Sequence, residues 1–339
     1  MMNFASDTSA PAHPRVLEAL ADANCGMEAS YGGDSVTASL RPLLEAAFET
    51  ADFDYWMTAS GTASNALALA CLCPSTGAVL CHEEAHIERD ERGAPEFFSG
   101  GGKLRLLKGF GARIDREALE AALAANNPAF VHETPAHALS LTNLTECGTA
   151  YRAADVALYA RLAKEKGLWV HLDGARLGNA LLSTRSSAAD MTWRAGVDVL
   201  SFGLTKTGAF GCELILLFGR ARTKFAELKV RAKRSGHMPA KMRFIAAQAR
   251  AMLEDGLWLE LAAEANARSG ELADAFIGAG FELAYPVDGN EVFAYLPEEV
   301  AARLQAAGAK FYPWPGGCYR FVCSWNTPAA DIEALAAAL

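Results

Sequence analysis

Short apolar runs alternate with longer helical segments along most of the chain. The runs are bounded by glycine or polar residues, which is typical of buried strands. Their alternation with helices from residue 55 to residue 218 favours an α/β fold with a mostly parallel sheet wrapped by helices. The expected strands are residues 55–58, 78–81, 104–107 and 212–218, with two further apolar runs at 168–173 and 198–206 and an alternating run at 138–149. The expected helices include residues 66–73, 115–125 and 154–166.

The pattern changes after residue 218. A basic stretch over residues 224–243 indicates a solvated helix face, and alanine-rich helices follow over residues 244–277. We expect two domains in 339 residues: an N-terminal arm with a large domain over residues 1–245, and a small C-terminal α+β domain over residues 246–339. The elements expected in the small domain are strands at 291–295 and 319–323 and helices at 297–305 and from 329 onward.

Composition narrows the class of protein. Hydrophobic residues make up 51% and charged residues 21%, as in ordinary globular proteins. The net charge of −9 argues against nucleic acid or an anionic membrane as a partner. The 8 cysteines show no zinc-site spacing, so we expect no metal. No signal peptide is evident, and no apolar run approaches the ~20 residues of a membrane helix, so we expect a cytoplasmic protein.

Two successive expected strands each end in an ionisable residue, Asp173 and Lys206. Ligands of α/β sheets bind beyond the carboxyl ends of the strands, so both side chains should face one crevice. A lysine amine forms a Schiff base with pyridoxal phosphate, and an aspartate pairs with the pyridine nitrogen of that cofactor. Singly, Asp173 is explained as a strand-end cap or a partner of Arg176, and Lys206 as a solvated lysine. Together they favour a cofactor site.

A candidate phosphate site lies between the strand at 55–58 and the helix at 66–73. Its residues are Ser60, Gly61 and Thr62. Small residues at a helix start leave backbone N–H groups free to face an anion, and the helix dipole favours negative charge there. Plain N-capping by Ser60 or Thr62 is the alternative. The spacing differs from the dinucleotide fingerprint.

The sequence resembles the low-specificity L-threonine aldolases of the β-eliminating lyase group, which are fold-type I, aminotransferase-like pyridoxal-phosphate enzymes. The resemblance rests on His-Leu-Asp-Gly-Ala-Arg at residues 171–176 and on Ser-Phe-Gly-Leu-Thr-Lys-Thr-Gly-Ala at residues 201–209. It implies that Lys206 carries the cofactor and that Asp173 pairs with its ring. It also implies a stacking histidine, for which we choose His86 over His82. The alternative for His86 is a helix-surface histidine.

The resemblance extends to further residues, each with a plainer alternative. Members of the family bind the substrate carboxylate with two arginines and a serine, which match Arg176, Arg320 and Ser6. The alternative for Arg320 is an internal ion pair. Asn143 could bond the ring oxygen of the cofactor or be an ordinary buried amide. The tyrosine that enters from a neighbouring subunit matches Tyr31, and Arg234 could reach the phosphate of a partner. We expect Arg176 to contact the cofactor as well.

These residues predict an enzyme that cleaves L-β-hydroxy-α-amino acids of the threonine, allo-threonine or phenylserine type to glycine and an aldehyde. Lys206, His86 and Asp173 are the expected catalytic residues. The second active-site histidine of better-known family members is missing near Thr145, so the base is His86 or a bound water. We expect a homo-oligomer, a dimer of dimers. The alternatives are β-elimination or transamination on the same cofactor, and a non-catalytic binding protein.

Overall fold

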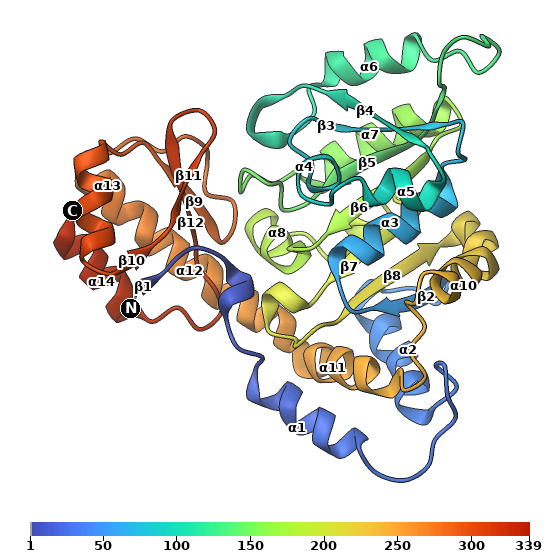
Figure 1. The fold of residues 1–339 in the computed structure, drawn as a ribbon, viewed down its shortest axis with the longest axis horizontal. Coiled ribbons are helices and arrows are strands. Elements are labelled where there is room, and N and C mark those ends of the chain that lie inside the picture. Colours follow the sequence, from blue (N-terminus) through green and yellow to red (C-terminus); the bar gives the residue numbers. More distant parts are fainter. Residues whose placement is uncertain (1) are drawn as a thin grey trace.

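The large domain is built on a seven-stranded sheet, whose strands follow one another from β4 near the top to β2 near the bottom of the large domain in Figure 1. The computed structural model describes residues 2–339. The strands are β2 (Phe53–Thr58), β3 (Ala78–His82), β4 (Lys103–Leu107), β5 (Ala136–Thr142), β6 (Trp169–Gly174), β7 (Val199–Gly203) and β8 (Glu213–Phe218). Their order is β2-β8-β7-β6-β5-β3-β4, and only β8 runs antiparallel to its two neighbours. The prediction of a mostly parallel sheet is confirmed.

Helices cover this sheet. The helix α3 is buried from Ala63 to Leu72, because it lies against the central strands and is covered by other helices. Some helix starts are capped by a side chain close by in the sequence. At the start of α2, the Asp34 carboxylate accepts the N–H of Thr37 at 2.7 Å. The helices of this part are α1 (Pro14–Ala23), α2 (Ser35–Phe48), α3 (Gly61–Leu72), α4 (His86–Arg89), α5 (Ala94–Ser99), α6 (Arg116–Ala124), α7 (Ala153–Glu165), α8 (Leu177–Thr184), α9 (Ala188–Met191), α10 (Phe225–Arg234) and α11 (Arg243–Leu253).

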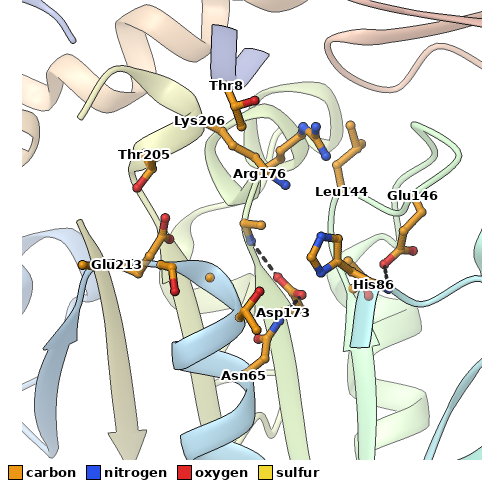
Figure 2. A pocket seen from close by; sticks show the side chains of 16 residues that line it. Thr8, Asn65, His86, Leu144, Glu146, Asp173, Arg176, Thr205, Lys206 and Glu213 are labelled. Carbon is orange, nitrogen blue, oxygen red and sulfur yellow. Dashed lines mark hydrogen bonds between the residues drawn. The ribbon is translucent and has the colours of Figure 1, made fainter. Parts of the chain in front are cut away.

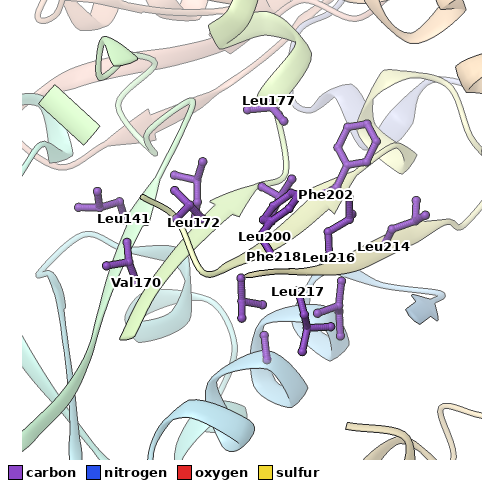
Figure 3. Packing of buried hydrophobic residues seen from close by; sticks show 14 of the residues in the cluster. Leu141, Val170, Leu172, Leu177, Leu200, Phe202, Leu214, Leu216, Leu217 and Phe218 are labelled. Atoms are coloured by element: carbon purple, nitrogen blue, oxygen red, sulfur yellow. The ribbon is translucent and has the colours of Figure 1, made fainter. Parts of the chain in front are cut away.

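The core of the large domain lies around β6, β7 and β8 (Figure 3). Every residue of β7 and β8 is buried, which explains their unbroken apolar runs, since both faces of the sheet are covered. Leu200, Phe202, Leu214 and Leu216 fill the space between neighbouring elements. The strands therefore hold the loops at their ends on a rigid frame.

The small domain has its own core, around Phe321. Its three-stranded antiparallel sheet has the order β11 (Tyr312–Trp314), β12 (Cys318–Val322), β9 (Glu291–Ala294), and it packs with α12 (Leu257–Gly278), α13 (Glu298–Ala306) and α14 (Ala329–Ala338). The start of the chain joins this domain, because β1 (Met2–Asn3) pairs in parallel with β10 (Ala309–Lys310). Met2 and Phe4 belong to the small-domain core.

The long helix α12 connects the two cores (Figure 1). Its first turns, with Leu257 and Leu261, pack in the large-domain core, whereas Leu272 and Phe276 pack in the small-domain core. The helices α11 and early α12 thus lie with the large domain. The predicted division at residue 245 stays a prediction, since a single connecting helix shared by both cores gives no sharp boundary.

No helix within residues 2–339 combines the length and the apolar character that crossing a membrane requires. Within the same residues, no three His, Cys, Asp or Glu side chains gather in a way that could hold a metal ion.

Candidate active site

A cavity lies at the carboxyl ends of the parallel strands β3, β5, β6 and β7, facing the first turn of α3 (Figure 2). This is the edge of an α/β sheet where ligands bind. The loops after β6 and β7 meet there closely, because a Cβ on Gly203 would lie 2.6 Å from the carbonyl oxygen of Ala175. The predicted residues that this cavity brings together are Ser60, Gly61, Thr62, His86, Asp173, Arg176 and Lys206.

Lys206 lies directly after β7, in the short 3₁₀ helix Thr205–Thr207. Its side chain forms no ion pair with any residue between 2 and 339. Burial, together with the charge of Arg176, lowers the pKa of Lys206 below its usual value, although Asp7 and Asp173 act in the opposite direction. A lowered pKa increases the fraction of neutral amine, which is the nucleophilic form.

Asp173 ends β6 and is only 3% exposed. Its Oδ2 accepts a hydrogen bond from Asn65 Nδ2 at 2.7 Å, and its Oδ1 accepts one from the Ala175 N–H at 2.9 Å. No cation of the described chain forms an ion pair with it. A buried carboxylate with neutral donors only is suited to pairing with a cationic ring nitrogen.

The first turn of α3 supplies donors on another wall of the cavity. Ser60 is the N-cap, and its Oγ accepts the N–H of Ala63 at 3.3 Å. The N–H groups of Gly61 and Thr62, earlier in the same turn, have no partner within the helix. Ser60 therefore caps the helix, as in the plainer interpretation, and all three residues line the cavity. Their role as a phosphate site, where an anion would meet the helix dipole, stays a prediction.

His86 begins α4 and is held by a chain of buried polar groups. Its Nδ1 lies 2.9 Å from Glu91 Oε1, and Asn65 Nδ2 donates to the same oxygen at 2.8 Å. Burial alone would lower the pKa of His86, but the hydrogen bond to Glu91 and the charge of Asp173 outweigh it and raise the pKa. Asn65 thereby connects the carboxylate of Asp173 to the one that orients His86.

Arg176 is 8% exposed and joins the N-terminal segment to the cavity. Its guanidinium donates to Asp7 through Nε–Oδ2 at 2.7 Å and Nη2–Oδ1 at 3.1 Å. Its Nη1 lies 3.6 Å from Glu291 Oε2. Burial would raise the pKa of Asp7, but the charges of Arg176 and Lys206 and two hydrogen bonds lower it to about 2. Asp7 is therefore ionised at neutral pH.

Arg320 lies in β12 and forms the internal ion pair that the sequence left open. Its Nε donates to Glu291 Oε1 at 3.0 Å, its Nη1 donates to the hydroxyl of Tyr312, and its guanidinium carbon lies 5.5 Å from the centre of the Trp314 ring. It does not line the cavity. Glu291 connects it to Arg176, so two cations and two anions form one neutral cluster.

The family model for beta-eliminating lyases matches residues 3–299. The chain belongs to the beta-eliminating lyase family. Two relatives are named low specificity L-threonine aldolase, one from Pseudomonas sp. and one from Pseudomonas aeruginosa, and each is 40% identical to this chain. Each match spans 98% of this chain, together with 96% of the first relative and 95% of the second. A structure of Leishmania major threonine aldolase is 27% identical with a TM-score of 0.92, over 99% of this chain and 98% of that one. The resemblance and the predicted fold-type I architecture are confirmed.

In this beta-eliminating lyase, four predicted site residues besides Arg320 lie outside the cavity. The Ser6 hydroxyl caps a 3₁₀ turn, where it accepts the Thr8 N–H at 3.2 Å, and Thr8 lines the cavity instead. The amide of Asn143 bonds the backbone of Tyr151 at 3.0 and 3.1 Å, as in the buried-amide alternative. Tyr31 is half exposed, and Arg234 ends α10 on the surface. Their roles in binding stay predictions.

The cavity of this lyase also contains polar residues that the sequence did not indicate: Asn65, Glu146 and Glu213. Asn65 is a single amide inside the apolar helix α3, a signal that could have been used. Glu146 follows β5 by four residues, and Glu213 opens β8. Burial raises the pKa of both glutamates to about 7. Acid-rich surface segments contain many glutamates, so neither of the two stands out in sequence.

Proposed function

We propose that this protein cleaves L-β-hydroxy-α-amino acids, of the threonine, allo-threonine or phenylserine type, to glycine and an aldehyde with pyridoxal phosphate as cofactor. The observation that carries the proposal is that Lys206 and Asp173, from two successive strand ends, face one cavity opposite the start of α3. The relatives named L-threonine aldolases support the choice of reaction. The fold alone would not, since one fold hosts many chemistries.

The residues of the cavity fit the cofactor on three counts. Lys206 offers an unpaired amine with a lowered pKa for covalent attachment. Asp173 is a buried carboxylate without a cationic partner, as a protonated pyridine nitrogen requires. The N–H groups at Gly61 and Thr62 provide a place for the phosphate. When bound, the cofactor supplies an electron-withdrawing ring that takes up the electron pair released at Cα.

The side chains of the protein select which bond breaks. Arg176 lines the cavity and presents a guanidinium held in place by Asp7 and Glu291, so it is the first carboxylate ligand that we propose. A bidentate contact would fix the direction of the substrate as well as its position. Arg320 is paired with Glu291, so it would contact the substrate carboxylate only if that ion pair opened. With the pair intact, it would act on substrate binding through Glu291, which holds Arg176. His86, oriented by Glu91, covers the side of the cavity opposite Thr205 and Glu213 (Figure 2).

We propose that the active form is a homo-oligomer, a dimer of dimers, in the cytoplasm. Tyr31 and Arg234 support this, since both are exposed and lie outside the cavity of their own chain. Closed symmetry is the usual state of soluble oligomers. In an oligomer, the ring of Tyr31 and the guanidinium of Arg234 would each contribute to the active site of a neighbouring subunit.

The test is a screen of β-hydroxy-α-amino acids with the cofactor-loaded protein, with glycine and aldehyde measured together. The proposal expects both products in equal amounts. Pyruvate and ammonia from serine or threonine would indicate β-elimination instead, and a keto acid formed with an aminated cofactor would indicate transamination. Absence of yellow colour and of cofactor absorbance after loading would contradict the cofactor assignment.

A further inference from the structure

Glu146 lies beside His86 in the wall of the cavity (Figure 2). It follows β5 in a loop in which Thr145 donates its hydroxyl to the carbonyl of Gly111 at 2.9 Å, and Leu144 lines the cavity with an apolar side chain. Glu146 Oε1 accepts the backbone N–H of His86 at 2.7 Å. One oxygen of the carboxylate is therefore fixed, and with it the direction of the other.

The second oxygen, Glu146 Oε2, is buried and has no hydrogen-bond partner within residues 2–339. A buried acceptor without a donor costs stability, and such atoms in native proteins call for an explanation. Asn65 Oδ1 and Glu91 Oε2 are also unpaired, but Asn65 carries an amide, which is no base, and Glu91 does not line the cavity. Glu146 Oε2 is thus a carboxylate oxygen at the cavity wall that a ligand donor would satisfy.

Glu213 is a second carboxylate of the cavity whose pKa burial raises, but unlike Glu146 it has no buried oxygen left without a partner. The remaining charged residues of the cavity have other roles. Lys206 and Asp173 mark the place of the cofactor, and Arg176 is the cation for a substrate carboxylate. His86 already uses its Nδ1 on Glu91 Oε1 at 2.9 Å, so this nitrogen is not free to take a proton from the substrate. A hydroxyl on the substrate side chain is the remaining donor that a retro-aldol substrate brings.

We propose that Glu146 is the base that takes the proton from the substrate β-hydroxyl, an inference that rests on the proposed aldolase function. The O–H bond breaks and its proton passes to Glu146 Oε2. The C–O bond becomes the aldehyde carbonyl as the Cα–Cβ bond breaks, and that bond's electron pair stays with Cα. Glu146 then releases the proton to solvent, and Cα takes up a proton to give glycine.

The electrostatics of the site support this role. Burial raises the pKa of Glu146 to about 7, with Asp173 adding to the rise, while the hydrogen bond from the His86 N–H and the charge of His86 act against it. A base whose pKa lies near the working pH is effective, because it is partly ionised and still binds a proton well.

The decisive variant is Glu146→Gln. It keeps a carbonyl oxygen to accept the His86 N–H, so a purely structural role would survive, but an amide cannot accept the hydroxyl proton. The holoenzyme variant should retain cofactor absorbance and melting temperature, and should exchange the α-proton of glycine in D₂O at close to the wild-type rate, since glycine has no hydroxyl. Its kcat for cleavage should fall by roughly 100-fold or more. Glu88→Gln, on α4 but outside the cavity, is the matched control and should leave both rates unchanged.

The outcomes separate this inference from the function on which it rests. Cleavage by Glu146→Gln at the wild-type rate would overturn the inference alone. Equal loss of cleavage and of glycine exchange with the cofactor still bound would also overturn it, because Glu146 would then serve Cα or the cofactor. Failure of the wild-type holoenzyme to release aldehyde from any β-hydroxy-α-amino acid would overturn the proposed function and this inference together.

Discussion

Asp7 holds Arg176 by two parallel hydrogen bonds, of 2.7 and 3.1 Å, across 169 positions of sequence. The segment that carries Asp7 follows β1, which pairs with the small domain, whereas Arg176 follows β6 of the large domain. Asn290, next to β9, donates from its Nδ2 to Asp7 Oδ2 at 3.0 Å, the oxygen that also accepts from Arg176 Nε. The two domains and the cavity therefore meet at one carboxylate.

Asp7→Asn should lower both stability and kcat/KM. The folded-state pKa of Asp7 is lowered to about 2 from a usual 3.8, so ionised Asp7 stabilises the fold above the unfolded-state pKa by about 2 kcal/mol. This contribution should begin to fall below about pH 4 and vanish toward pH 2. Urea unfolding of wild type and variant between pH 7 and pH 3 measures it. A stability difference that grows as the pH falls would contradict the assignment.

Lys206 should carry the cofactor. Borohydride treatment of the holoenzyme followed by peptide mapping should place the label on Lys206, because it is the lysine that lines the cavity and its lowered pKa favours the neutral amine. Lys206→Ala should abolish turnover while leaving the fold intact. A label on Lys224, Lys229 or Lys233 would show that the cofactor lies elsewhere.

Asp173→Asn should fold but lose most of its turnover. An amide cannot stabilise the positive charge on a pyridine nitrogen, and it keeps only one acceptor oxygen for the two donors Asn65 and Ala175. Steady-state glycine release together with cofactor absorbance tests this, with the exposed Asp190→Asn as control. Wild-type rates in Asp173→Asn would mean that Asp173 only ends a strand.

Arg320→Lys distinguishes the two roles of Arg320. If Arg320 binds the substrate carboxylate, the lysine variant should keep its melting temperature and cofactor but show a higher KM and a lower kcat, because the guanidinium fork that orients the carboxylate is lost. Arg320→Ala should do more harm than Arg320→Lys. It should lower the free energy of unfolding by roughly 2–5 kcal/mol, because Glu291 would be left buried with a weaker partner. A lowered melting temperature with unchanged kinetics in Arg320→Lys would assign Arg320 to the internal ion pair alone.

The protein should be a dimer or tetramer when active, as light scattering with a dilution series of activity can show. Subunits carrying Lys206→Ala and subunits carrying Tyr31→Ala should each be inactive or weak, and mixed oligomers should regain activity. One site of such a hybrid combines an intact Lys206 with the partner's Tyr31. A monomer that is fully active when dilute would contradict the prediction.

Much of the fold was predictable because burial leaves a local signature. Strands β7 and β8 are covered on both faces, so their sequences are continuous apolar runs, and each polar residue at such a strand end stands out. That is why Asp173 and Lys206 could be found from sequence and placed at one crevice. The turn Ser60 to Thr62 was equally local, since a helix start is encoded by its own few residues.

Only the tertiary structure decided the partners of the charged groups. Glu291 lies between Arg176 and Arg320, Asn65 lies between Asp173 and Glu91, and Glu146 meets the backbone of His86. Several of these contacts join residues more than a hundred positions apart, as Asn65 and Asp173 do. An ion pair or a hydrogen bond depends on a few ångströms of distance between packed elements, and that distance leaves no periodic pattern in the sequence of either one.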